Sequence, residues 1–190
     1  IAISGTHGKT KTTAMVAKIL IDGGIDTTVI VGSLLKEGNT NFVFGKSRPV
    51  RLNGISRPGG YLVVEADEYR KSFHGLEPTI LVITNIDEDH LDYYKDLADI
   101  QNAFKELVKK IPEEGFLVCD ISNPHVLPVA EAARCAVLDY GSVGNLDFKL
   151  HLPGAHNRQN AKAALLVGGI LGIAKQIAET ALVNFKGTWR

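Results

Sequence analysis

A run of small, polar and basic residues near the start of the chain has the composition of a phosphate-binding turn. The run consists of Gly5, Thr6, His7, Gly8, Lys9 and Thr10. Backbone N–H groups of such a turn, together with the positive end of a following helix, bind phosphate. Lys9 would add a positive charge near the outer phosphates, and Thr10 would add a hydroxyl ligand for Mg²⁺. These residues predict that the chain binds a nucleoside triphosphate.

The motif is shorter than the standard Walker sequence, which would place a glycine where this chain has Ile3. The alternative interpretation is a chance glycine-rich turn. The flanking elements favour the functional interpretation, because residues 1–4 have the pattern of a short buried strand and residues 9–22 that of a helix.

An acidic cluster follows residues 61–66, which have the apolar pattern of a buried strand. The cluster consists of Glu65, Asp67 and Glu68. A carboxylate at the tip of a strand that faces a phosphate loop is a common ligand of Mg²⁺ or of its water shell. The cluster alone would be interpreted as a solvated acidic loop. The apolar strand that leads directly into it favours a role in binding.

Asp89 and His90 follow a further predicted strand, residues 79–84. A neutral imidazole can ligate a metal ion, and a neighbouring carboxylate can orient the ring. A purely structural role for His90 fits the spacing equally well, so both interpretations stay open.

A fourth polar group opens a predicted helix, residues 155–171. His156 and Asn160 are four residues apart, and Asn157 and Asn160 are three apart, so they share one face of the first turn. An Asn side chain can donate to and accept from the edge of adenine at once. On the spacing alone, the favoured alternative is a polar helix cap with nothing bound.

The bulk composition excludes several classes of protein. The formal net charge is zero, which argues against nucleic acid or an anionic membrane as the main partner. No apolar run approaches the length of a membrane span. The two cysteines, Cys119 and Cys135, make no disulfide framework and indicate a reducing compartment. We therefore expect a cytoplasmic protein.

Strands that alternate with helices along the chain predict an α/β fold, a P-loop NTPase-like, mostly parallel sheet with helices on both faces. Further strands are expected at residues 27–31, 116–119, 136–138 and 146–152, with weak hairpin strands within residues 32–60. Further helices are expected at residues 95–111, 124–133 and 174–184. Ligands bind beyond the carboxyl ends of strands in such sheets, so the phosphate-binding turn, the acidic cluster and the segment from Asn85 to His90, which each follow a predicted strand, should converge on one edge.

Taken together, these motifs resemble those of the Mur ligase family, the ATP-dependent ligases of peptidoglycan precursor synthesis. Residues 5–10 are similar to the phosphate loop of the family. Residues 65–68, 84–90 and 156–160 are similar to its later motifs and stand in the expected order. The resemblance covers residues 1–190 and corresponds to the central, ATP-binding domain. It implies that the N-terminal UDP-sugar domain and the C-terminal ligase domain are absent from this chain, and that the domain alone is inactive.

The residue at position 7 indicates the branch. Branches that add alanine to UDP-N-acetylmuramate, or that reattach recycled peptide to it, favour the Thr-His-Gly-Lys-Thr found here. The alanine-adding branch is the best match and the recycling ligase is its near neighbour. The alternative from another class is a P-loop nucleotide-binding module without ligase activity. A GTPase is disfavoured, because Asn85-Ile86-Asp87 lacks the Lys of the guanine-reading motif. A folate-type glutamate ligase is disfavoured by His7.

The resemblance implies a two-step reaction. ATP phosphorylates the substrate carboxylate, and an amine then displaces phosphate from the acyl phosphate to give an amide and ADP. Lys9 would stabilise the β- and γ-phosphates. Thr10 and Glu65 would hold one Mg²⁺, and His90 would help to hold a second. The residues expected to seat the nucleoside are His156, Asn157 and Asn160, and Arg190 matches the first position of a terminal Arg-containing motif.

Three departures from the family pattern stand out. Lys11 occupies a position where the family normally has Thr. Phe104 aligns with a Lys that is carbamylated in several relatives, and we assign no role to the adjacent Lys105. Residues 69–73 are more basic than is usual in the alanine-adding branch.

Overall fold

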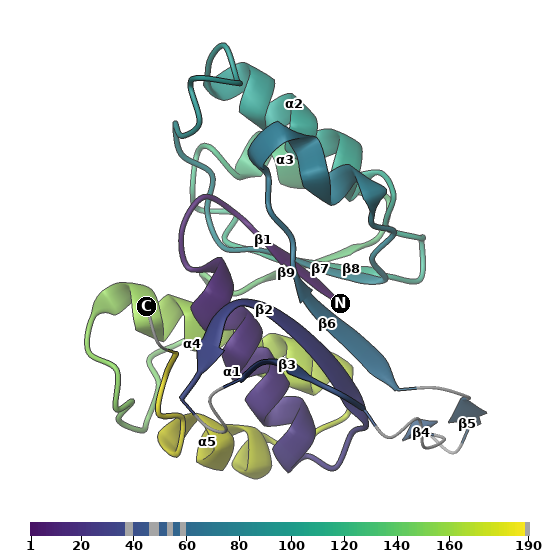
Figure 1. Cartoon of the computed structure of the whole chain (residues 1–190), viewed down its shortest axis with the longest axis vertical. Helices are drawn as coiled ribbons and strands as arrows, with labels where there is room; N and C mark the ends of the chain where they lie inside the picture. The colour runs from purple at the N-terminus through teal and green to yellow at the C-terminus, as the bar shows by residue number, and fades with distance from the viewer. Residues whose placement is uncertain (37–39, 46–49, 53–54, 58–59, 189–190) are drawn as a thin grey trace. The chain divides into compact units, whose positions relative to one another are not determined.

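The computed structural model describes residues 1–36, 40–45, 50–52, 55–57 and 60–188 of the chain (Figure 1). The chain divides into two compact units. The first unit comprises Ile1–Lys9 and Ala66–Gly144, and the second comprises Thr10–Glu65 and Asn145–Arg190.

The first unit is built on four parallel strands in the order β1, β7, β8 and β9. Their bounds are Ala2–Ser4 (β1), Ile80–Ile83 (β7), Phe116–Cys119 (β8) and Ala136–Asp139 (β9). All four residues of β7 are buried. Such a continuous apolar run is typical of a strand that is covered on both faces of a parallel sheet.

The helices of the first unit are η1 (Tyr69–Gly75, a 3₁₀ helix), α2 (Leu97–Val108) and α3 (Leu127–Ala130). Asp96 caps α2, because its carboxylate accepts a hydrogen bond from the N–H of Asp99. Phe73 of η1 and Phe104 of α2 meet edge to face, with ring centroids 5.2 Å apart, and both are fully buried. This contact packs η1 against α2.

In the second unit, β2 (Thr27–Leu35) pairs with β6 (Tyr61–Glu65) in parallel and with β3 (Thr40–Val43) in antiparallel orientation. A two-stranded hairpin is formed by β4 (Val50–Leu52) and β5 (Ile55–Arg57). The helices are α1 (Lys9–Asp22), α4 (Ala155–Ile170) and α5 (Lys175–Val183). A Cβ at Gly168 would lie 2.9 Å from Cγ2 of Ile19, so a glycine allows α4 to approach α1 closely.

The expected α/β fold with mostly parallel strands is confirmed, and several elements have the predicted bounds. The helix at residues 9–22 and the strand at residues 116–119 match α1 and β8. The hairpin expected within residues 32–60 is also present. The expected helix at residues 124–133 is shortened to Leu127–Ala130.

The strand expected at residues 146–152 is wrong. Burial alternates along this segment as the sequence suggests, and Leu150 is buried, but no strand pairs with it among the described residues. Nη2 of Arg158 donates to the carbonyl of Leu146 instead, so a side chain takes over part of what a neighbouring strand would provide.

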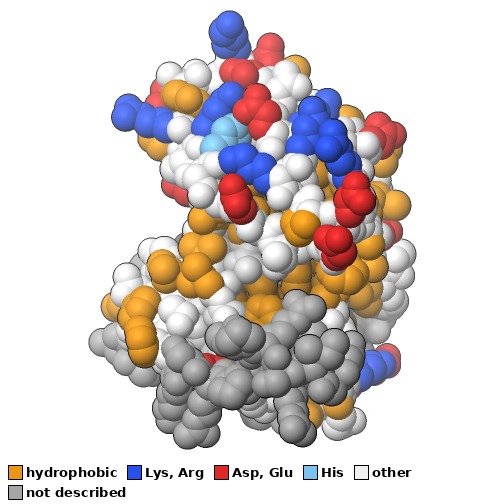
Figure 2. Space-filling model, turned by 90° about the vertical axis from the view of Figure 1, so that its right-hand side faces the viewer, with side chains coloured by type: hydrophobic (Ala, Val, Ile, Leu, Met, Phe, Trp, Pro, Cys, Tyr) orange, Lys and Arg blue, Asp and Glu red, His pale blue; other side chains and the backbone are white. Residues whose placement is uncertain are grey.

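The basic segment noted in the sequence lies on a mixed-charge surface. Lys71 Nζ and His74 Nδ1 lie 3.7 and 3.5 Å from Oε2 of Glu106, and Lys110 donates to the carbonyl of His74. Figure 2 shows basic and acidic side chains interspersed, with a histidine among them, in its upper part. The surface has the character of a solvated face.

Within the described part of the chain, no helix combines the length and apolar composition needed to cross a bilayer.

Candidate functional site

The glycines of the predicted phosphate loop, between β1 and α1, adopt backbone conformations that other residues avoid. Gly5 has φ +128° and Gly8 has φ +86°. A Cβ at Gly5 would also lie 2.2 Å from Oγ1 of Thr84 and 2.8 Å from the carbonyl oxygen of Asn85. Gly5 is therefore required both for the turn and for close contact with the segment that follows β7.

Hydrogen bonds fix the loop to that segment. The N–H of Thr6 donates to the carbonyl of Asn85 (3.1 Å), and the N–H of His7 donates to Oδ1 of Asn85 (2.8 Å). Oγ1 of Thr84 donates to the carbonyl of His7 (2.6 Å), and the N–H of Asp87 donates to Oγ1 of Thr6 (2.9 Å). Thr84 and Asn85 thus position the loop, although only the resemblance, and no pattern of residue types, pointed to them.

Lys9 contacts a carboxylate that the sequence did not single out from its neighbours. Its Nζ lies 2.7 and 3.0 Å from the two carboxylate oxygens of Glu68, and it donates to the carbonyl of Gly5 at 2.7 Å. The side chain of Glu68 is only 2% exposed. Burial raises the pKa of Glu68, and the hydrogen bond and charge of Lys9 oppose that shift.

The backbone around Glu68 is held on both sides. The N–H of Ala66 donates to the carbonyl of Ile3 in β1 at 2.8 Å, and Oγ of Ser4 donates to the carbonyl of Ala66 at the same distance. The hydroxyl of Tyr94 donates to the carbonyl of Glu68. Burial raises the pKa of Tyr94 to about 12, so this hydroxyl keeps its proton at neutral pH.

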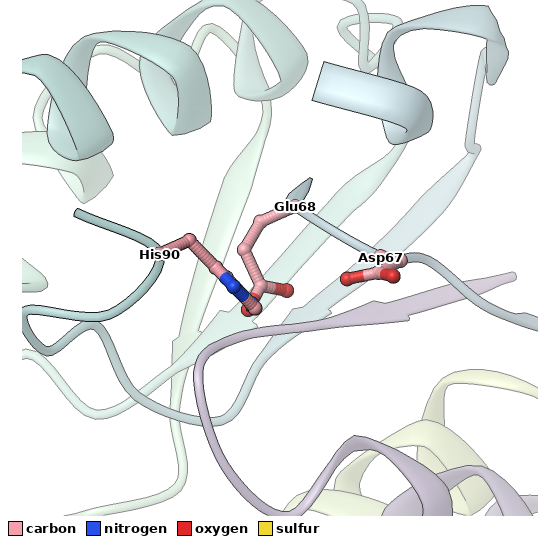
Figure 3. Close-up of side chains that lie close together, drawn as sticks. All are labelled: Asp67, Glu68 and His90. Atoms are coloured by element: carbon pink, nitrogen blue, oxygen red, sulfur yellow. The ribbon is translucent and has the colours of Figure 1, made fainter. Parts of the chain in front are cut away.

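His90 completes a group that could hold a cation (Figure 3). Nε2 of His90 lies 3.5 Å from Oε1 of Glu68. Asp67, Glu68 and His90 each offer one ligand atom, and the three atoms lie within 4.8 Å of one another. Among the residues that the structure describes, this is the one group of three or more such side chains. Carboxylates with an imidazole suit a divalent cation.

Thr10, the residue after Lys9, also contacts a carboxylate. Oγ1 of Thr10 donates to Oε1 of Glu65 at 2.9 Å, and the N–H of Gly32 donates to Oε2 of Glu65 at 2.8 Å. The hydroxyl and carboxylate oxygens that the sequence assigned to one Mg²⁺ are therefore in direct contact.

The polar residues at the start of α4 differ in their exposure. Asn157 and Asn160 are 3% and 6% exposed, whereas His156 is exposed. Nδ2 of Asn157 donates to the carbonyl of Pro153 at 2.6 Å. Oδ1 of Asn157 and Nδ2 of Asn160 have no hydrogen-bond partner among the described residues. Buried amide atoms without partners are costly, and such atoms often bind a ligand.

None of the polar side chains of this group caps α4, so the capping role considered for them in the alternative interpretation is wrong. The residue that caps α4 is Gly154, and no side chain makes a capping hydrogen bond there. The terminal Arg190 lies outside the described residues.

The structure brings most of the predicted residues into contact within each unit. Lys9 and His90 meet through Glu68 in the first unit, and Thr10 meets Glu65 in the second. The expected convergence of the phosphate loop with the segments that follow strands is confirmed for these pairs. Phe104, at the position of the carbamylated Lys of some relatives, is a fully buried core residue.

Sequence reasoning missed Gly32. The sequence predicts that the strand ends at residue 31, whereas β2 continues to Leu35. No side-chain motif marks a backbone N–H as a donor.

Comparison with known proteins identifies relatives. A family model of the Mur ligase middle domain matches residues 3–145. The chain is 36% identical to the UDP-N-acetylmuramate–L-alanine ligase of Caldicellulosiruptor saccharolyticus and 38% identical to that of Clostridium acetobutylicum. Each comparison covers all of this chain, but only 45% and 44% of those two proteins. The chain thus spans less than half the length of these relatives.

Two solved structures are similar over the whole chain. One is the UDP-N-acetylmuramate:L-alanyl-gamma-D-glutamyl-meso-diaminopimelate ligase of Neisseria meningitides, with a TM-score of 0.86, 27% identity and 67% of that chain covered. The other is the UDP-N-acetylmuramate-alanine ligase of Thermotoga maritima, with a TM-score of 0.77, 25% identity and 45% of that chain covered. Because the family model matches most of the sequence and these structures share its fold, the chain belongs to the Mur ligase family and corresponds to its middle domain.

Proposed function

We propose that this chain is the ATP-binding domain of a ligase that adds L-alanine to UDP-N-acetylmuramate in peptidoglycan precursor synthesis. The curated relatives carry that activity in their names. One observation carries the proposal: at the start of α1, Lys9 contacts Glu68 and the next residue, Thr10, contacts Glu65. The Lys9 ammonium and a hydroxyl–carboxylate pair therefore stand at the end of the phosphate loop. Phosphoryl transfer uses such groups to neutralise phosphate charge and to hold Mg²⁺.

The contact between Thr10 and Glu65 fits a magnesium site. Their oxygens lie 2.9 Å apart, and hydroxyl and carboxylate oxygens are the hard ligands that Mg²⁺ prefers. When bound, Mg²⁺ would neutralise charge that develops on the β- and γ-phosphate oxygens. His90, with Glu68 and Asp67, offers ligands for a second cation, which we assign to the side of the substrate carboxylate.

Lys9 would exchange one anionic partner for another. In the structure its ammonium faces the Glu68 carboxylate and the carbonyl of Gly5. The phosphates of ATP, bound by the glycine-rich loop, would draw the ammonium toward the β- and γ-oxygens. Phosphate oxygens offer it stronger, charge-assisted hydrogen bonds than the Gly5 carbonyl does.

The chemistry that follows requires positioning and charge neutralisation from the protein. An oxygen of the substrate carboxylate attacks the γ-phosphorus, the bond to the β-phosphate oxygen breaks, and an acyl phosphate and ADP result. The neutral amine nitrogen then attacks the acyl carbon, the bond from that carbon to the phosphate oxygen breaks, and an amide forms while inorganic phosphate leaves with the proton that the nitrogen loses. We assign the UDP-sugar and amine sites to parts of the full-length protein other than this chain, since its curated relatives are more than twice as long.

The buried asparagines of α4 support a nucleoside site. Oδ1 of Asn157 is an acceptor without a partner and Nδ2 of Asn160 is a donor without a partner among the described residues. The edge of adenine offers one donor and one acceptor, which these two atoms would match. His156, being exposed, would contact the nucleoside only from the rim, and Arg190 stays a predicted ligand.

A second candidate is the recycling ligase, which joins a preformed peptide to the same sugar nucleotide. It is favoured by the structural similarity to the Neisseria enzyme, with a TM-score of 0.86. A cytoplasmic location fits either ligase, and the described cysteines, Cys119 and Cys135, are both free thiols.

The test has two parts. In the 190-residue chain, Lys9→Ala should weaken binding of Mg²⁺-ATP in a calorimetric titration, and unchanged affinity would contradict the phosphate-loop assignment. In the full-length protein, ADP release over many turnovers should require UDP-N-acetylmuramate together with L-alanine. If only the peptide L-alanyl-gamma-D-glutamyl-meso-diaminopimelate supports turnover, the recycling reaction is correct. If neither amine supports amide formation, the chain is a nucleotide-binding module without ligase activity.

A further inference from the structure

The Glu65 carboxylate is held at both of its oxygens. Oγ1 of Thr10 donates to Oε1 at 2.9 Å, and the backbone N–H of Gly32 donates to Oε2 at 2.8 Å. Gly32 lies in β2, and Glu65 is the last residue of β6, which pairs with β2 in parallel. The carboxylate therefore reaches across to the neighbouring strand and is fixed there by main chain.

Gly32 leaves no room for a side chain. A Cβ there would lie 2.9 Å from Oε2 of Glu65 and 3.2 Å from its Cδ and Oε1. The three nearest atoms all belong to the carboxylate, and the strand conformation of β2 accepts alanine without strain. An added methyl group would displace the end of the Glu65 side chain and leave the strand in place.

We propose that Gly32 is a positioning residue of the magnesium site. This inference rests on the proposed function, which assigns Thr10 and Glu65 to Mg²⁺. Because Gly32 occupies Oε2, it directs Oε1 toward the Thr10 hydroxyl, the second proposed ligand. The carboxylate is ordered before the cation binds, so less side-chain entropy is lost on binding.

A purely structural role for Gly32 predicts a different result. If the glycine only permitted close packing of strands, Gly32→Ala would lower the stability of the fold. It would then weaken ATP binding equally with and without Mg²⁺. A positioning role weakens only the binding that depends on the metal ion.

The test measures ATP affinity of the 190-residue chain by calorimetry, once with Mg²⁺ and once with a chelator. For Gly32→Ala we expect the affinity for Mg²⁺-ATP to fall about tenfold or more, the usual effect of losing a group that orients a metal ligand. Affinity for metal-free ATP should be unchanged. The matched control is Gly169→Ala in α4, where a Cβ would meet nothing within 4 Å.

A rescue variant separates displacement of the carboxylate from other effects. Aspartate is one methylene shorter than glutamate, so Glu65→Asp withdraws the carboxylate from the new methyl group. We expect the double variant Gly32→Ala/Glu65→Asp to bind Mg²⁺-ATP better than the sum of the two single losses predicts. Strict additivity would mean that the two residues do not act through each other and would overturn the proposal.

A measurement on the unaltered chain covers the case in which Gly32→Ala does not fold. The ¹H–¹⁵N resonance of Gly32 should shift when Mg²⁺ is added to the ATP-bound chain, because its N–H donates to a carboxylate that then binds the cation. If the Gly32 resonance does not shift on addition of Mg²⁺ although ATP affinity depends on Mg²⁺, the positioning role of Gly32 is refuted while the magnesium site itself is not. If ATP affinity of the unaltered chain does not depend on Mg²⁺, the magnesium site itself is wrong, and the role of Gly32 with it.

Discussion

The ammonium of Lys9 and the carboxylate of Glu68 form an ion pair at 2.7 Å, in which the side chains are 13% and 2% exposed. The two residues are 59 positions apart in the chain. The pair joins the end of the phosphate loop to the segment that follows β6. A buried pair of this kind is costly to break from one side, because the remaining charge is left without compensation.

Removal of Lys9 should therefore destabilise the chain in a pH-dependent way. Burial raises the pKa of Glu68 and Lys9 opposes the rise, so in Lys9→Ala that pKa lies higher still. A carboxyl group with a raised pKa in the folded state stabilises most below its unfolded pKa, and this contribution is lost as pH rises through the folded value. We expect Lys9→Ala to lower the free energy of unfolding by about 3 kcal/mol at neutral pH.

Urea denaturation from about pH 5 to about pH 8 measures this, with the loss shrinking toward the acid end. The variant Lys9→Ala/Glu68→Gln has no buried charge left without a partner. Its loss of unfolding free energy at neutral pH should therefore be much smaller. A loss that is the same at every pH would contradict the account.

Thr10→Ala should weaken Mg²⁺-ATP binding and leave metal-free ATP binding nearly unchanged. The substitution removes the hydroxyl that lies 2.9 Å from Oε1 of Glu65. A loss of about tenfold is expected from removing one ligand or its immediate partner. Calorimetry with and without Mg²⁺ measures it, and Thr180→Ala, at an exposed threonine of α5, is the matched control. Equal losses in the two titrations would show that Thr10 contacts phosphate and not the cation.

Asn160→Leu should stabilise the chain while it weakens nucleotide binding. Nδ2 of Asn160 is buried without a partner among the described residues, and an apolar side chain of similar size avoids that cost. We expect a gain of about 1 kcal/mol in the free energy of unfolding, together with a fall in ATP affinity.

Thermal unfolding and calorimetry test the two effects separately. Asn102→Leu, at an exposed asparagine of α2, is the control and should change neither strongly. Stabilisation with full retention of ATP affinity would remove Asn160 from the nucleoside site.

Gly5→Ala should destabilise the first unit severely. Gly5 has φ +128°, and its Cβ would lie 2.2 Å from Oγ1 of Thr84. Strain and overlap together should cost about 3 kcal/mol or more in the free energy of unfolding, measured by urea denaturation. Gly75→Ala, where a Cβ would meet nothing within 4 Å, should be nearly neutral. A folded, equally stable Gly5→Ala variant would mean that the loop has another conformation.

The parts of this fold that local patterns encode could be predicted from the sequence. The helical spacing of Met15, Ile19 and Leu20 predicted α1, and all three side chains are buried. The segment at residues 146–152 has the alternation of a strand, but pairing depends on a partner that alternation does not specify. A strand requires both the alternation and a pairing partner, so the predicted strand at residues 146–152 is wrong.

The candidate site could likewise be predicted from the sequence only in part. The residue types marked the loop and the carboxylates, since phosphate and cations need those groups. Which carboxylate faces Lys9 depends on how the chain turns after β6, and the sequence could not distinguish Glu68 from Asp67. Gly32 contributes only its backbone N–H, which no residue type in the sequence marks. Its contact with Glu65 follows from the pairing of β2 with β6, which only the structure shows.

Phe104 has a consequence for the chemistry of the proposed reaction. Carbamylation is the addition of carbon dioxide to a lysine amine, and a phenyl ring buried against Phe73 offers no nitrogen for it. A cation beside His90 would therefore complete its coordination with water or substrate oxygens. The rate of the proposed ligase would then be independent of dissolved carbon dioxide.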